Sequence, residues 1–187
     1  MGWFFSIIRI AGASFPVASS LVQLQAELDS KKLSSALNEL SDPISNLHED
    51  VPSASKEIYK KIRELDTNAL TFSDDFYDQY TRPLAALEAN GHIKKAQGVG
   101  QQYPINIRIC DASYVMYLCA LYEDSNSMKK LVESVDNCKI GQLLDATDLN
   151  KTLDLPIEVI KAVFTIYESK GYGNVSKEHG KTYTGKA

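Results

Sequence analysis

Residues 146–175 read ATDLNKTLDLPIEVIKAVFTIYESKGYGNV. The spacing of their apolar positions predicts a short helix, a turn and a second helix that ends at Gly171, because glycine readily adopts the positive φ with which a chain leaves a helix. Val175 and Tyr183 lie in short β-prone runs on either side of Gly180, and such runs predict a hairpin. We therefore expect two helices followed by a hairpin.

The same pattern of helix, glycine and hairpin occurs eighty residues earlier. There a helix is expected to end at Gly91, residues 97–100 to form a turn, and residues 103–109 to alternate as a strand does. Aligned without a gap, the two copies share four identical residues: Glu88, Gly91, Gly100 and Tyr103 with Glu168, Gly171, Gly180 and Tyr183. The preceding apolar stripes also align: Tyr77, Tyr80, Leu84 and Leu87 with Ile157, Ile160, Phe164 and Tyr167. The chain is thus predicted to contain two related units.

Residues 110–187 resemble the winged-helix form of the helix-turn-helix. In that family a short helix and a turn lead into a second helix, which starts with leucine, any residue, leucine and proline. The chain then leaves the second helix through glutamate, any residue, lysine, glycine and an aromatic residue. Leu153 to Pro156 match the first motif here, and Glu168 to Tyr172 match the second. Residues 112–123 correspond to the first core helix of the family. Residues 54–109 resemble the same unit more loosely and depart from it at Pro83, inside the expected second helix.

These patterns together predict a mainly α fold with small β-hairpins (α+β). We divide the chain into an apolar segment and helical region (1–53), a helical and hairpin unit (54–109) and a winged-helix domain (110–187). The first region carries apolar residues with the spacing of a coiled coil: Leu33, Leu37, Leu40, Ile44, Leu47 and Val51. Because Pro43 and Pro52 interrupt this run, helices that meet at a bend and helices that pair between chains both remain open.

The beginning of the chain is its most apolar stretch. Arg9 interrupts the apolar run and nothing basic precedes it except the amino terminus, which is unlike a signal peptide. Polar residues before position 23 make the stretch unlike a membrane-spanning helix. Two alternatives remain for residues 1–28: they are buried in the chain itself or in an oligomer, or they contact a membrane peripherally. We expect the protein to be otherwise cytoplasmic. The candidate contact residues are Trp3, Phe4, Phe5, Ile7 and Ile8.

Composition and motifs argue against an enzyme. The 187 residues are 44% hydrophobic and 24% charged, which is typical of a globular protein. The three cysteines form no CxxC pair and the three histidines are scattered, so we expect core cysteines and neither a metal site nor a cofactor. The acidic residues Asp74, Asp75 and Asp78 match the aspartate-rich pattern of isoprenoid synthases, but a helix capped by Ser73 with acids in its first turn is the simpler interpretation.

A winged helix that reads DNA places its second helix in the major groove and its wing against phosphates. The net charge of −4 excludes coating of nucleic acid by bulk electrostatics, and residues 151–187 carry a net charge of only +2. Candidate contacts to a partner or nucleic acid are Lys161, Lys170, Lys177, His179, Lys181, Lys94, Lys95 and Arg108.

The near-neutral helices and ten tyrosines favour protein contacts. We therefore predict a non-enzymatic winged-helix interaction or adaptor protein, which binds a protein partner and forms a homo-oligomer. The alternative is a transcriptional regulator that binds duplex DNA through its C-terminal winged helix.

Overall fold

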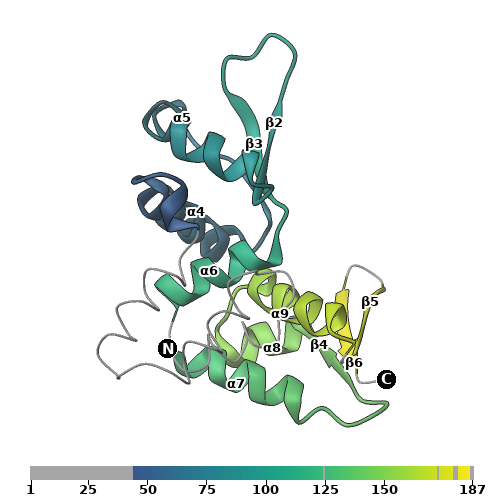
Figure 1. Ribbon diagram of the computed structural model, residues 1–187. Coiled ribbons are helices and arrows are strands. Elements are labelled where there is room, and N and C mark those ends of the chain that lie inside the picture. The colour runs from purple at the N-terminus through teal and green to yellow at the C-terminus, as the bar shows by residue number, and fades with distance from the viewer. Residues whose placement is uncertain (1–43, 124, 172, 179–180, 186–187) are drawn as a thin grey trace, which may run out of the picture.

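The computed structural model describes residues 44–187 except 124, 172, 179, 180, 186 and 187. The first half contains η1 (Ser45–Leu47), α4 (Val51–Leu65), β1 (Ala69–Leu70), α5 (Asp74–Ala89), β2 (Ile93–Gln97) and β3 (Pro104–Ile109). The second half contains α6 (Ala112–Tyr122), α7 (Ser125–Asp136), β4 (Leu143–Asp145), α8 (Ala146–Leu153), α9 (Ile157–Ser169), β5 (Asn174–Glu178) and β6 (Lys181–Gly185). The prediction of a mainly helical α+β fold with small hairpins is confirmed (Figure 1).

Several sequence-based expectations concern residues outside the described part. These include the apolar contact residues Trp3, Phe4, Phe5, Ile7 and Ile8 and most of the leucine run. In the described part, α4 begins at Val51, because the first turn of a helix accommodates Pro52 without losing a hydrogen bond.

The two halves repeat one topology. We call residues 51–109 the first unit and residues 125–185 the second unit, with α6 between them. Each unit has a three-stranded antiparallel sheet in which the first strand pairs with the last, in the orders β1-β3-β2 and β4-β6-β5. In the first unit the hairpin of β2 and β3 projects from the helical body (Figure 1).

Helix α5 contains a break that accounts for Pro83. Tyr80 has non-helical backbone angles, φ −112° and ψ 22°, so α5 consists of two helical segments. Pro83 then lies in the first turn of the second segment, where a missing N–H costs no helical hydrogen bond. The two segments of α5 thus correspond in order to α8 and α9 of the second unit.

The residues that align between the two units have the same local roles. Oε1 of Glu88 accepts a hydrogen bond from the backbone N–H of Lys95 at 2.9 Å, and Oε1 of Glu168 accepts one from Val175 at 2.8 Å. Gly91 and Gly171 leave their helices with φ of 77° and 71°. In both units the glutamate therefore ties the end of the helix to the first strand of the hairpin.

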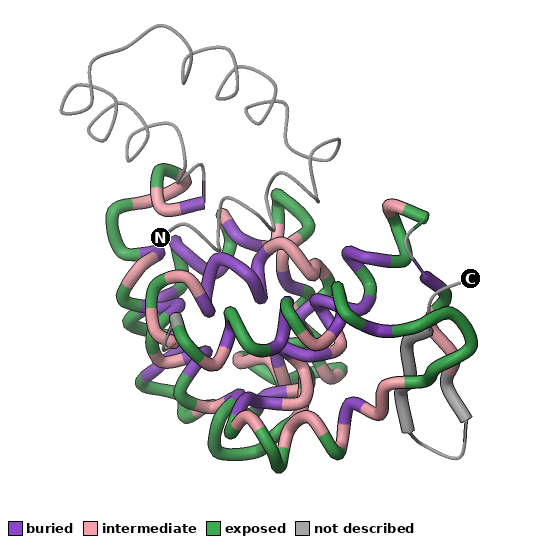
Figure 2. The backbone as a smooth tube through the Cα atoms, turned by 90° about the horizontal axis from the view of Figure 1, so that it is seen from below, coloured by how far each residue is buried: buried purple, intermediate pink, exposed green. Residues whose placement is uncertain are grey.

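Helix α6 contributes Tyr114 to Cys119 to a core that is continuous through both units. Figure 2 shows buried stretches of the chain gathered inside the molecule. The three tyrosine side chains of α6 form hydrogen bonds within the chain: Tyr114 with Ser55 at 2.9 Å, Tyr117 with Ser45 at 2.7 Å and Tyr122 with the Pro52 carbonyl at 2.7 Å. The interpretation of the tyrosines as partner contacts is wrong for these three, because they are buried or half-buried in the core.

Candidate functional site

The structure divides the predicted contact residues between two surfaces. Lys94, Lys95 and Arg108 lie on the hairpin of the first unit. In the second unit Lys161 lies on α9 and Lys170 follows at its C-terminal cap, while β5 contains Lys177 and β6 contains Lys181. His179 is outside the described residues.

Two cations of the hairpin face each other across the ladder. Lys94 and Arg108 occupy directly opposite positions on β2 and β3, and both side chains are exposed. Neither forms an ion pair with a residue in the described ranges, whereas Lys95 pairs with Glu88 at 2.9 Å. Like charges directly opposite each other destabilise a sheet, so this pair is a surface feature suited to an anionic group.

Helix α9, which the sequence predicts as the helix that contacts a partner or DNA, is covered on its broad apolar face. Its buried residues form one broad apolar face: Val159, Ile160, Ala162, Val163, Phe164, Ile166 and Tyr167. Helix α6 lies along it and makes the most extensive helix–helix contact among the described residues. Thr165, Glu168 and Ser169 remain exposed on the opposite face, so α9 is amphipathic and directs its broad apolar face at the core.

The N-terminus of α9 is capped by a residue from the first unit. Pro156 precedes the helix and has no side-chain acceptor, but the backbone N–H of Ile157 donates to Oδ1 of Asp66 at 2.5 Å. The Asn150 amide also donates to Oδ2 of Asp66 at 3.4 Å and to the Leu155 carbonyl at 2.7 Å. Because Asp66 is 91 residues from Ile157, no local motif could have identified this cap.

A second polar contact also links the units. Arg63 of α4 donates to Glu123 at the end of α6 and, at 3.4 Å, to Asp154 in the turn before α9. The Tyr59 hydroxyl donates to the same Glu123 carboxylate at 2.6 Å, and the Glu123 side chain is only 5% exposed. Burial, together with Cys119 and Glu123 nearby, raises the pKa of Tyr59 far above its ordinary value, so this hydroxyl remains a donor.

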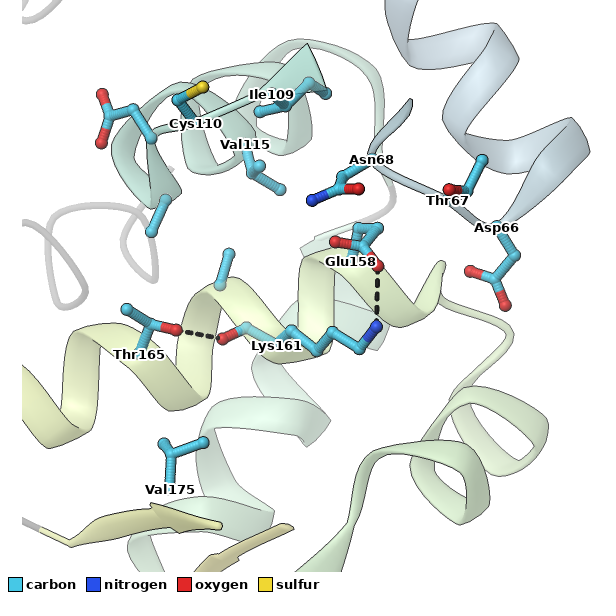
Figure 3. Close-up of a pocket in the computed structure, with 13 residues that line it drawn as sticks. Asp66, Thr67, Asn68, Ile109, Cys110, Val115, Glu158, Lys161, Thr165 and Val175 are labelled. Atoms are coloured by element: carbon cyan, nitrogen blue, oxygen red, sulfur yellow. Dashed lines mark hydrogen bonds and ion pairs between the residues drawn. The ribbon is translucent and has the colours of Figure 1, made fainter. Parts of the chain in front are cut away.

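A cleft of about 590 Å³ lies between the first unit and α9. One wall of the cleft is formed by residues 66–68, by residues 109–112 and by Val115. The other wall is formed by side chains of α9 and by Val175 of β5. Figure 3 shows the Asn68 side chain extending into the space above α9, with Glu158 and Lys161 below it. Lys161 Nζ donates to Glu158 Oε1 at 2.8 Å, so the predicted contact Lys161 is half-buried and paired here.

The rim of the cleft holds a histidine and aspartate pair. Nδ1 of His92 lies 2.8 Å from Oδ2 of Asp111, whose Oδ1 accepts the N–H of Ser113 and caps α6. Burial opposes ionisation of Asp111, but the bonds from His92 and Ser113 outweigh it and lower its pKa. The neighbouring Cys110 is exposed, so the expectation that all three cysteines lie in the core is wrong for this one.

The aspartates at the start of α5 do not gather around one point. Asp78 accepts a hydrogen bond from the Tyr103 hydroxyl at 2.7 Å. Ser73 occupies the N-cap position, but its side chain makes no capping bond to the described residues. Within the described ranges, no group of three or more His, Cys, Asp or Glu side chains could hold a metal ion, and no helix is long and apolar enough to cross a membrane.

Comparison with protein-family models, curated protein sequences and solved structures found no match to this chain.

Proposed function

We propose that this chain is a non-enzymatic winged-helix interaction protein, which binds a protein partner and associates with itself. The order of elements supports the winged-helix interpretation. In the second unit α7 is followed by a short helix (α8), a turn, a second helix (α9) and a hairpin (β5 and β6). In this proposal α7, and not residues 112–123 as the sequence predicts, takes the place of the first core helix. The first unit has the same order once α5 is read as two segments.

The covered position of α9 favours protein contacts over DNA. A winged helix that reads DNA presents this helix to the major groove. Here α9 contacts α6 along its length, its N-terminal N–H group is occupied by Asp66, and its central cation is paired with Glu158. What α9 leaves exposed is Thr165, Glu168 and Ser169, which include no cation.

The first unit, in contrast, has a free helix face and a projecting hairpin. In the second segment of α5, Arg82, Ala85 and Ala89 are exposed. Towards the tip of the hairpin, Val99 is fully exposed and Ile105 is 51% exposed. Exposed apolar side chains that sit beside uncharged residues are typical of protein contact surfaces. Ile140 and Leu143 of the second unit are also exposed, so it is the projecting hairpin together with Val99 and Ile105 that leads us to place the partner on the first unit.

Site-specific photocrosslinking tests this proposal with a matched pair of positions. A photoreactive amino acid is placed at Ala85 or at Thr165, which are aligned between the two units and are both exposed. In extracts of the source organism we expect a discrete protein adduct from position 85 and none from position 165. Equal adducts from both positions, or none from position 85, would contradict the proposed role of the first unit. Light scattering over a concentration series measures self-association.

A DNA-binding regulator is the second candidate, and the unpaired cations Lys94 and Arg108 favour it. Fluorescence anisotropy with labelled duplex DNA, repeated across a salt titration, tests this function. If the protein is a regulator, binding persists at physiological salt and falls after Lys94→Glu with Arg108→Glu. Loss of binding after Lys161→Glu with Lys177→Glu would instead assign DNA contact to the C-terminal unit.

A further inference from the structure

The cleft between the first unit and α9 has no role in the proposed function. Its volume of about 590 Å³ lies within the range of small-ligand sites, which commonly form where two structural units meet. Both units contribute walls, so an occupant would contact Asn68 on one side and α9 on the other. The chemistry of these two walls therefore decides which ligand the cleft suits.

The inner surface of the cleft is apolar and shallow. Ile109, Val115 and Ala162 line it and are each only 5–6% exposed, so they leave little of their own surface to solvent. Ala112 at the start of α6 and Ala162 on α9 are small, and they leave room between the two helices. This surface suits a narrow aliphatic group.

The charged residues around this surface are mostly acidic. Among the described residues that line the cleft, three are acidic, Asp66, Asp111 and Glu158, and one is a cation, Lys161. The two oxygens of Asp66 accept from an N–H of the backbone and from an amide, which are neutral donors and leave its negative charge in place. The formal charge of the lining is thus −2, and it attracts cations.

One cation on an aliphatic stem already occupies the cleft. The Lys161 stem runs along the wall in Figure 3 and brings its ammonium to the Glu158 carboxylate. The Glu158 side chain is 14% exposed and that of Lys161 is 34% exposed, so the carboxylate is the more enclosed partner. No other donor among the described residues reaches the Glu158 carboxylate. Lys161 therefore shows which chemistry the site accepts.

We propose that this cleft binds an amphipathic cation, namely a guanidinium or primary ammonium group on an aliphatic stem. The charged group of the ligand takes the place of Lys161 Nζ at Glu158, and its stem lies over Val115 and Ala162. Such a group is supplied either by an arginine or lysine side chain of an extended peptide or by a free amine. This inference goes beyond the proposed function and does not depend on it.

Titration of the full chain with two probes tests the proposal, with binding followed by calorimetry. Agmatine represents the free amines, and N-acetyl-arginine-N′-methylamide represents a side chain within a peptide. Glu158→Gln is expected to weaken binding about tenfold, since a hydrogen bond to a charged acceptor is lost. The matched control is Glu133→Gln on α7, which removes an exposed carboxylate paired with Lys129 and is expected to leave binding unchanged.

Lys161→Met is expected to change the binding affinity in the opposite direction from Glu158→Gln. A gain in affinity cannot result from misfolding, so this variant separates loss of the site from loss of the fold. Removing the internal competitor should tighten probe binding about twofold, because a helical ion pair of this spacing is weak. Binding of agmatine alone would assign a free amine, and binding of both probes would assign a peptide side chain. The proposal is overturned if neither probe binds the wild-type chain or Lys161→Met, or if Lys161→Met abolishes binding, as expected for a site that binds anions.

Discussion

The second segment of α5 and helix α9 occupy the same place in their units, yet the exposed face is wider in α5 than in α9. Both end at a glycine, and both carry a glutamate that binds the next strand. The outer positions differ: Arg82 is exposed and Ala86 half-buried in α5, whereas the aligned Ala162 and Ile166 are buried in α9. The repeated motif therefore determines the helix and hairpin, but not the accessibility of the helix.

Helix α6 accounts for this difference. Six consecutive residues of α6, Tyr114 to Cys119, are buried, which requires neighbours on every side. It contacts α4 of the first unit and α9 of the second, while α5 makes its main contacts with α4 and β2. A linker helix that is apolar all round thus joins the two units and covers α9.

The largest expected effect comes from placing a charge at the two aligned positions. Ile166→Arg should lower the free energy of unfolding by about 3–5 kcal/mol or prevent folding, because the cation has no buried partner. Ala86→Arg should change it by no more than about 0.5 kcal/mol, as is usual at partly exposed sites. Urea denaturation measures both. Similar losses in the two variants would show that α5 is covered as fully as α9.

Removal of the cap between the units should have the next largest effect. Asp66→Ala is expected to cost about 1–2 kcal/mol, because the N-terminus of α9 loses its acceptor. Asp66→Asn should cost less, since asparagine retains an acceptor oxygen and tolerates the left-handed backbone that Asp66 adopts, with φ of 49°. If denaturation shows equal losses for alanine and asparagine, the hydrogen bond to Ile157 does not stabilise the fold.

The stabilisation that Glu88 provides should depend on pH. Burial opposes ionisation of Glu88, but the backbone N–H and ammonium of Lys95 outweigh it and lower its pKa. A lowered pKa means that this stabilisation is present at neutral pH and is lost as the pH falls below the ordinary value of 4.5.

Glu88→Gln should therefore cost about 0.5 kcal/mol at pH 7, a value reduced by solvent screening, and almost nothing at pH 3. Glu168→Gln serves as the comparison, because Val175 supplies only a backbone N–H. Denaturation at both pH values measures the difference. If Glu88→Gln costs the same stability at pH 3 as at pH 7, this account is contradicted.

The smallest expected effect is a gain in stability. Arg108→Glu replaces the repulsion between Lys94 and Arg108 with an attraction, and should stabilise the fold by about 0.3 kcal/mol. Arg108→Gln is the neutral control, and its stability should lie between those of the wild-type chain and Arg108→Glu. The change in melting temperature measures the gain, and a loss of stability would show that the arginine has a structural role that these contacts do not reveal.

Much of the fold could be predicted from local sequence. Gly91 and Gly171 mark the helix ends because few other residues leave a helix with positive φ, and alternation over residues 103–109 marks a strand that is half buried. The hairpin turn at residues 98–100 and the cap of α6 by Asp111 also depend on neighbours in the chain. Such features need only short-range geometry, so the sequence by itself determined them.

The candidate site depended on contacts that periodicity does not encode. Lys161 was identified as a contact residue, and its partner Glu158 lies one helical turn away on α9. The cap from Asp66 and the wall formed by Asn68, in contrast, follow from how the first unit sits on α9. An apolar pattern shows that a face is buried, yet it does not show which element buries it. Only the tertiary structure decided that α6 covers α9, that α5 remains open and that a cleft lies between the units, because these outcomes depend on packing between segments far apart in the chain.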